Sequence, residues 1–172
     1  LADGAGMLHV AWSDAETGEI LYARARVQEA GSAGWSAPRV LSAATAEGVA
    51  PSGAWPQLAL DDQGNLHLLY VVPANEGRGV YLVRSADGGA TWTVPEPVFD
   101  AAAARWPAVS HPSLAIGRDG TRYVAWVQTE ALGSATMGVY AAQGVVTHGP
   151  DGADVTWSAA RVLADPGNDW PR

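Results

Sequence analysis

The sequence predicts an all-β protein made of short antiparallel strands. Its apolar runs are short, and its 172 residues include 20 Gly and 11 Pro, which favours many strands joined by tight turns. One pattern also recurs along the chain at intervals of about 57 residues, with strand-like segments in the same order each time. Four short antiparallel strands per unit are typical of a β-propeller blade. We therefore expect a β-propeller of four-stranded blades, with three blade repeats in this chain that form half of a six-bladed ring.

The repeats also define the domain organisation. We expect one propeller segment over residues 1–172, with units at about 1–54, 55–110 and 111–169, and with 170–172 starting a further innermost strand. Joining the last residues, WPR, to the first, LAD, closely imitates the segment WPQLAL of the second unit. This match predicts either a piece of a longer propeller or a half-ring that associates with a second copy.

The strands follow in the same order in each unit. Innermost strands are expected at 55–60 (WPQLAL) and 111–116 (HPSLAI). Glycine turns at Gly6, Gly64 and Gly120 precede second strands at 8–12, 66–70 and 122–126. Third strands are marked by Tyr22, Tyr81 and Tyr140, and fourth strands open at Trp35, Trp92 and Trp157. Internal prolines in two of the fourth strands favour an outer edge, because proline donates no hydrogen bond to a ladder.

Composition excludes several classes of function. The net charge is -8 and every basic residue is an arginine, without the basic stripe that nucleic acid binding requires. No apolar stretch is long enough for membrane insertion. The chain has no Cys, so it offers neither disulfides nor thiolate metal ligands, and no cofactor is expected.

The segment SADGGATW at 85–92 is the most informative motif. It resembles the Asp-box (BNR) repeat, S-x-D-x-G-x-T-W, of sialidase-like β-propellers, and every specified position matches: Ser85, Asp87, Gly89, Thr91 and Trp92. The first unit keeps only a glycine and the tryptophan at 29–35. The third unit keeps Asp151, Gly152, Thr156 and Trp157.

The resemblance implies a fold more than a reaction. In that family the Asp box is a structural turn on the face opposite the active site, and the proteins act at the cell surface or outside the cell. A sialidase would also bring a Phe-Arg-Ile-Pro segment, an arginine triad and a Tyr/Glu nucleophile pair. No Phe-Arg-Ile-Pro segment occurs here, and the sole Phe, Phe99, is followed by Asp100. No catalytic residue is therefore assigned.

A ligand site is expected on the face opposite the Asp box, where the loops between the second and third strands meet those between units. Arg105 and Trp106 form the preferred recognition pair, because a guanidinium binds carboxylates and an indole stacks on a sugar ring. Further candidates on this face are Arg78, Glu76, Asp100 and His111. The alternative is that Trp106 packs at the start of a strand and that the charged side chains are solvated.

No metal site is predicted. His9 and His67 occupy equivalent positions in neighbouring units, but such positions lie apart along a ring, and hydrogen bonding by neutral rings is the commoner role. The acidic turns at 61–64 and 151–154 lack the spacing of a calcium-binding loop.

Three functions remain open. The leading hypothesis is a non-catalytic extracellular module that binds a glycan or a protein through the loop face. The alternatives are a fragment of a sialidase-like glycoside hydrolase, and a half-propeller whose activity is self-assembly into a homo-oligomeric ring.

Overall fold

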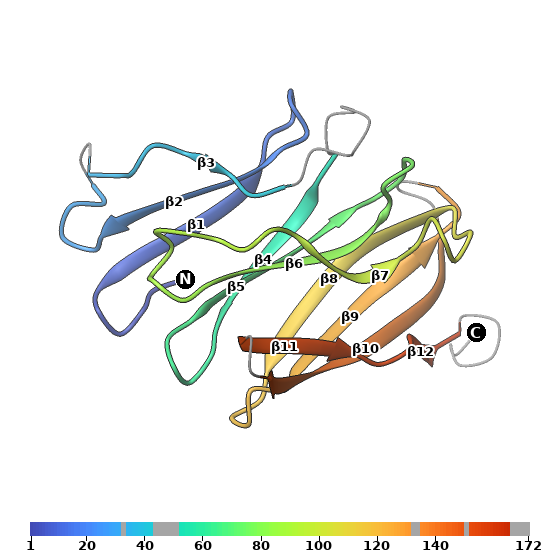
Figure 1. Cartoon of the computed structure of the whole chain (residues 1–172). Helices are drawn as coiled ribbons and strands as arrows, with labels where there is room; N and C mark the ends of the chain where they lie inside the picture. Colours follow the sequence, from blue (N-terminus) through green and yellow to red (C-terminus); the bar gives the residue numbers. More distant parts are fainter. Residues whose placement is uncertain (32–33, 43–51, 132–134, 150–151, 166–172) are drawn as a thin grey trace.

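The structure is a computed structural model that describes residues 1–31, 34–42, 52–131, 135–149 and 152–165. Its regular elements in these residues are all strands, arranged as three antiparallel sheets that lie side by side (Figure 1). The prediction of an all-β fold of antiparallel sheets is confirmed. The three sheets do not close into a ring by themselves, so the number of blades stays a prediction, as do the repeat boundaries.

Each sheet is a meander of neighbouring strands. The first has the order β1 (Met7–Ser13), β2 (Ile20–Arg26) and β3 (Arg39–Val40). The central sheet has the order β4 (Ala54–Leu60), β5 (Leu66–Val72), β6 (Gly79–Ser85) and β7 (Glu96–Asp100). The third sheet contains β8 (Ala108–Ile116), β9 (Arg122–Thr129), β10 (Thr136–Gly149), β11 (Gly152–Trp157) and β12 (Arg161–Ala164), with β11 and β12 both paired to β10. The segment before β1 also lies against it, where the His9 N–H donates to the carbonyl of Leu1 at 2.9 Å.

Strand β5 of the central sheet is buried on both faces. All seven residues of β5 are buried, which explains why its sequence, LHLLYVV, is continuously apolar except for His67. Leu68 and Tyr70 pack toward the first sheet, in a cluster with Ile20, whereas Leu69 packs in a second cluster with Trp126 of the third sheet. Each fully buried leucine of this kind stabilises the fold by roughly 1.5–3 kcal/mol. The side chains of β5 thus hold the three sheets together.

The antiparallel ladders sort the connections into two ends. Leu66 pairs with both Leu60 and Ser85, so the turns at 61–65 and 86–93 share one end, which we call the turn end. Gly79 pairs with both Val72 and Asp100, so the connections at 73–78 and 101–107 share the opposite end, which we call the loop end. The turn at 117–121, between β8 and β9, also belongs to the turn end.

The outer strands differ from the prediction. In the central sheet the outer strand begins at Glu96 and not at Trp92, because Trp92 packs on Tyr22 of the first sheet, with ring centroids 4.9 Å apart. In the third sheet Trp157 ends β11, and β12 supplies the outer strand. The β-branched pairs Val145–Thr156 and Val146–Val155 continue the ladder of β10 and β11 beyond the expected strand end.

The three tyrosines lie on the third strands β2, β6 and β10, as predicted, but Tyr22 does not hold the ladder position of Tyr81. His9 pairs with Arg24 and His67 with Arg84, and two residues earlier on β2 and β6 stand Tyr22 and Leu82. Tyr22 is therefore the counterpart of Leu82, not of Tyr81. Both connections have six residues, 14–19 and 73–78, but β5 continues for five residues beyond His67 whereas β1 continues for four beyond His9, and a shift of one residue moves a side chain to the opposite face of the sheet.

The turn at 85–92 is held by its own polar side chains. Asp87 accepts hydrogen bonds from the Thr91 hydroxyl at 2.6 Å, the Thr91 N–H at 2.8 Å and the Ser85 hydroxyl at 2.8 Å. These donors hold the pKa of Asp87 well below its usual range. A carboxylate engaged in this way stabilises a turn and is poorly suited to proton transfer.

The same turn also connects two sheets. Arg24 of β2 donates through Nη1 to the carbonyl of Gly88, and Arg39 of β3 donates to the carbonyl of Ala90. Gly89, at a φ of 83°, lies directly against the phenol of Tyr22. The turn of the central sheet therefore docks on the first sheet.

Candidate functional site at the loop end

The six candidate residues from the sequence all lie at or near the loop end, and three of them make contacts within the scaffold. Arg78 donates from Nε to the carbonyl of Trp106 at 2.5 Å and from Nη1 to the carbonyl of Asn75 at 2.9 Å. It thereby ties the connection at 73–78 to the one at 101–107. Asp100 is exposed, yet its Oδ1 accepts the N–H of Ala103 at 2.8 Å and caps the turn that follows β7.

Trp106 packs inside the protein. Its ring lies between Phe99 and Tyr140, at centroid distances of 4.5 and 4.3 Å, and it joins the apolar cluster between the central and third sheets. This geometry favours the packing alternative over recognition. Arg105 and Glu76 are exposed, and nothing in the described contacts orients either side chain toward Trp106. A joint role of Arg105 and Trp106 in recognition stays a prediction.

His111, in contrast, meets an aromatic partner from another sheet. Its ring stacks on Trp55, with centroids 4.9 Å apart and planes at 24°. Trp55 lies on β4 and His111 on β8, so the pair bridges the first strands of two neighbouring sheets. Both side chains are exposed, Trp55 to 36%. The Trp55–His111 pair is the one aromatic stack with two exposed rings in the described part of the chain.

Two matching β-bulges present the pair. Trp55 and Pro56 together stand opposite one residue of β5, and His111 and Pro112 opposite one residue of β9, because the register shifts at both places. A bulge re-aims side chains, and proline supplies no N–H to restore the ladder. The repeated W-P and H-P dipeptides were visible in the sequence, but the displacement of their side chains follows from the bulge geometry.

The backbone at this end is strained. Trp55, Arg105 and His111 are the non-glycine residues with positive φ in the described chain, at 51°, 59° and 47°. Such conformations cost about 1–3 kcal/mol each and concentrate at functional sites. All three lie at the loop end, two of them in the exposed pair. Strain in the same place as exposed aromatic rings points to this pair as the candidate site.

The chemistry of the pair is that of a recognition surface. An indole face and a stacked imidazole offer a flat apolar platform, and His111 Nδ1 lies 3.0 Å from the Ser110 hydroxyl. The described residues contain no group of three or more His, Asp or Glu side chains that could hold a metal ion. They also include no helix suited to crossing a membrane.

Comparison with known proteins extends the description of the fold. No protein-family model matches the sequence, and no curated protein does. The chain is similar to the intramolecular trans-sialidase from Ruminococcus gnavus in complex with oseltamivir carboxylate, with a TM-score of 0.53, 17% identity and coverage of 94% of this chain and 32% of that one. It is also similar to a Hadza microbial sialidase, with a TM-score of 0.52, 14% identity and coverage of 92% and 36%.

A polysaccharide lyase is among the similar structures as well. This ulvan lyase, bound to -[GlcA(1-4)Rha3S]-, gives a TM-score of 0.52 at 13% identity and covers 83% of this chain and 37% of its own. The chain thus spans about a third of each of these enzymes. Similarity at such identities shows the fold alone: the sheets are arranged as in proteins of sialidase-like fold.

Proposed function

We propose that this chain is a segment of a sialidase-like β-propeller that binds a carbohydrate on the Trp55–His111 pair. The observation that carries the proposal is the exposed stack itself, held on strained backbone at two equivalent bulges. Sugar rings present apolar C–H faces that stack on aromatic rings, and their hydroxyls reach polar groups at the edge of the stack. The similar structures are named as enzymes that act on glycans, which supports a carbohydrate as the ligand.

The proposal includes the arrangement around the site. Closure of further sheets into a ring would bring other loop ends next to this pair, either from more of the same chain or from a second copy. A location at the cell surface or outside the cell belongs to the same proposal, because it rests on the Asp-box resemblance of residues 85–92.

Binding can be tested by titrating the protein with 3′-sialyllactose, with lactose and with an oligosaccharide of the GlcA–Rha3S type, using tryptophan fluorescence and calorimetry. We expect saturable binding of at least one of these sugars, and a loss of about tenfold or more in affinity for Trp55→Ala. Trp35→Ala is the matched control, since Trp35 is also 36% exposed but lies in the connection between β2 and β3. Equal loss in both variants, or binding unaffected by Trp55→Ala, would contradict the assignment.

Glycoside hydrolysis is the second candidate function, favoured by the enzymatic character of the similar structures. It predicts release of product from a fluorogenic sialoside by the full-length protein, and loss of that activity in His111→Ala or Arg105→Ala. Binding without turnover would favour the module over the hydrolase.

A further inference from the structure

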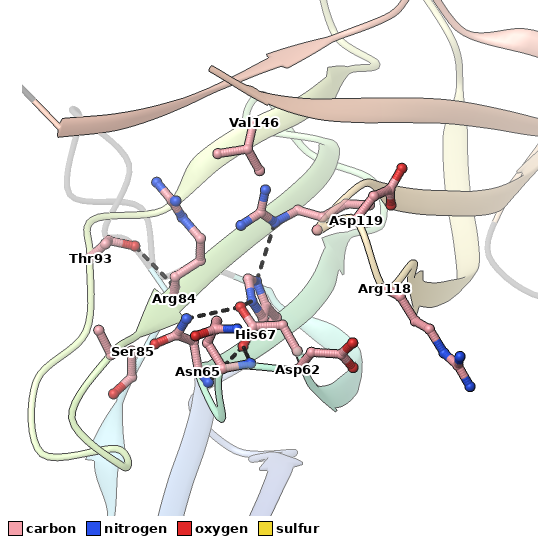
Figure 2. Close-up of a pocket in the computed structure, with 14 residues that line it drawn as sticks. Asp62, Asn65, His67, Arg84, Ser85, Thr93, Arg118, Asp119 and Val146 are labelled. Carbon is pink, nitrogen blue, oxygen red and sulfur yellow. Dashed lines mark hydrogen bonds and ion pairs between the residues drawn. The ribbon is translucent and has the colours of Figure 1, made fainter. Parts of the chain in front are cut away.

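A cleft at the turn end, opposite the Trp55–His111 pair, separates the central and third sheets. Its volume is about 470 Å³. It is lined by the turns at 61–65 and 118–120, by the end of β6, and by residues of β9 and β10. Figure 2 shows the side chain of Arg84 extending from β6 toward Val146, beside His67 of the neighbouring strand β5. Three arginines contribute to this lining: Arg84, Arg118 and Arg122.

Arg122 is the unusual member of the lining. Only 5% of its surface is exposed, and its Nη1 has no hydrogen-bond partner in the described structure. Its Nε lies 3.4 Å from Nδ1 of His67, whose Nε2 lies 3.1 Å from Oδ2 of Asp61. Burial is the largest cause of the lowered pKa of His67, so the imidazole is neutral and Nδ1 acts as an acceptor. A neutral ring does not balance the charge of a buried guanidinium.

Arg84 adds a second cation to the cleft, paired at its outer end with Glu96. Its Nε is buried and has no partner among the described atoms, and its Nη2 lies 3.8 Å from Oε2 of Glu96. The other oxygen of Glu96 accepts a hydrogen bond from the indole of Trp157 at 2.9 Å. Burial, and then the charge of Arg84, lower the pKa of Arg122. Two guanidinium groups that repel each other in a desolvated cleft attract an anion.

The carboxylates in the lining are engaged elsewhere. Asp61 accepts the Asn65 N–H and side-chain amide, both at 2.9 Å, and Asp119 accepts the Thr121 N–H at 3.0 Å and hydroxyl at 2.9 Å. The pKa values of both carboxyl groups are lowered; burial alone would raise that of Asp61, and its hydrogen bonds outweigh the burial. Both carboxylates stabilise their own turns. Asp62 is exposed at the rim of the cleft.

The junction between the first and central sheets shows which group accepts the hydrogen bond of an arginine that is equivalent to Arg84. Arg24 occupies on β2 the place that Arg84 occupies on β6, and its Nη1 donates to the carbonyl of Gly88. There the turn at 85–92 fills the space between the sheets. At the second junction the extended hairpin of β10 and β11 replaces that turn, and the structure describes no carbonyl or carboxylate on Arg84 Nε or Arg122 Nη1.

We propose that the cleft binds an oxoanion, a sulfate or carboxylate group, between Arg84 and Arg122. Guanidinium groups bind such anions through paired N–H donors, and an anion here would satisfy both unpartnered nitrogens next to the buried charge of Arg122. The anion can be free in solution or part of an acidic saccharide. The site lies at the end of the sheets opposite the Trp55–His111 pair, so the two proposals are independent.

The test measures the thermal unfolding midpoint and the arginine side-chain NMR signals during titration with sodium sulfate and sodium acetate, against sodium chloride at equal ionic strength. We expect saturable stabilisation by sulfate or acetate beyond that by chloride, with shifts of arginine Nε–H signals that Arg84→Gln and Arg122→Met remove. Affinity should fall about tenfold or more in either variant. Arg26→Gln, at an exposed position of β2, is the control and should bind as the parent does.

Glucose 6-sulfate and glucuronate, compared with glucose, distinguish a saccharide-borne anion from a free one. The proposal is overturned if sulfate and acetate act no differently from chloride. It is also overturned if Arg122→Met is more stable than the parent protein at every anion concentration, because the arginine would then be an uncompensated buried charge. Should Arg122→Met fail to fold, Arg84→Gln decides the question, since Arg84 is less buried.

Discussion

Substitution of Gly89 by alanine tests the docking of the central sheet on the first. A Cβ built at Gly89 would lie 1.9 Å from Oη and 2.6 Å from Cζ of Tyr22. The phenol cannot move away easily, because Tyr22 is only 2% exposed, lies 2.7 Å from His9 Nδ1 through its hydroxyl and packs against Trp92. The φ of Gly89, 83°, adds backbone strain for any residue with a side chain.

The expected loss can be divided into two parts. Placing alanine at a positive φ costs about 1 kcal/mol, and overpacking of a tight contact adds about 1–3 kcal/mol. Gly89→Ala should therefore lower the free energy of unfolding by about 3 kcal/mol, which corresponds to a fall of roughly 6–12 °C in Tm for a chain of this size. Gly64→Ala is the control, since Gly64 has a φ of 78° but no atom within 4 Å of its built Cβ. It should lose about 1 kcal/mol.

Urea and thermal unfolding, followed by tryptophan fluorescence, measure both variants. If Gly89→Ala costs no more than Gly64→Ala, the turn does not dock on Tyr22 as described. A double-mutant cycle sharpens the result: Tyr22→Phe removes the nearest oxygen, so Gly89→Ala should cost less in the Tyr22→Phe background.

Two further predictions concern residues singled out in the sequence. The lowered pKa of Asp87 means that its carboxylate contributes stability above the unfolded pKa, about 3.8, and that this contribution is lost as the pH falls through the folded pKa. Urea midpoints of the parent and Asp87→Asn should therefore differ at pH 7 and converge as the pH falls below about 4; a difference independent of pH would contradict this. Trp106→Ala should lower the free energy of unfolding by about 3 kcal/mol, through lost packing on Phe99 and Tyr140, without changing carbohydrate affinity. Arg105→Ala, at the exposed neighbouring position, should change stability by no more than about 0.5 kcal/mol, and equal losses in the two variants would refute the packing role.

The strand positions were predictable because local sequence determines them. Glycines at positive φ, such as Gly64 and Gly120, mark the turns between innermost and second strands, and the apolar run at 66–70 lies within the buried strand β5. The spacing of Tyr22 and Tyr81 did not reveal that they hold different positions in their ladders. Counting from tyrosine to tyrosine does not show that the ladder beyond His67 is one residue pair longer than the ladder beyond His9.

The candidate site was predictable only in part. The sequence analysis names His111 as a candidate but not Trp55, because a W-P dipeptide at a strand start does not reveal a bulge. Arg122 was not selected. Its importance depends on contact between the second and third sheets, and single-sequence reasoning reports periodicity within a strand, not which strands of separate sheets face one another.

The central sheet contacts the first sheet at one junction and the third sheet at the other. The contacts at these junctions explain why the Asp-box turn at 85–92 is complete and the copy in the third unit is not. At the first junction Gly89 has to lack a side chain because Tyr22 fills the space, and the carbonyl of Gly88 has to face Arg24, so the turn must keep its compact form. At the second junction, between the central and third sheets, Leu82 holds the ladder position that Tyr22 holds at the first. A leucine at this position has no phenol that would require a glycine opposite it. The hairpin of β10 and β11 is longer than the turn at 85–92. Among the described residues no carbonyl contacts Nε of Arg84, whereas Arg24 donates to the carbonyl of Gly88. The cleft and its unpartnered guanidinium nitrogens thus lie at the junction where the turn sequence departs from the repeat, and this is the place of the proposed anion site.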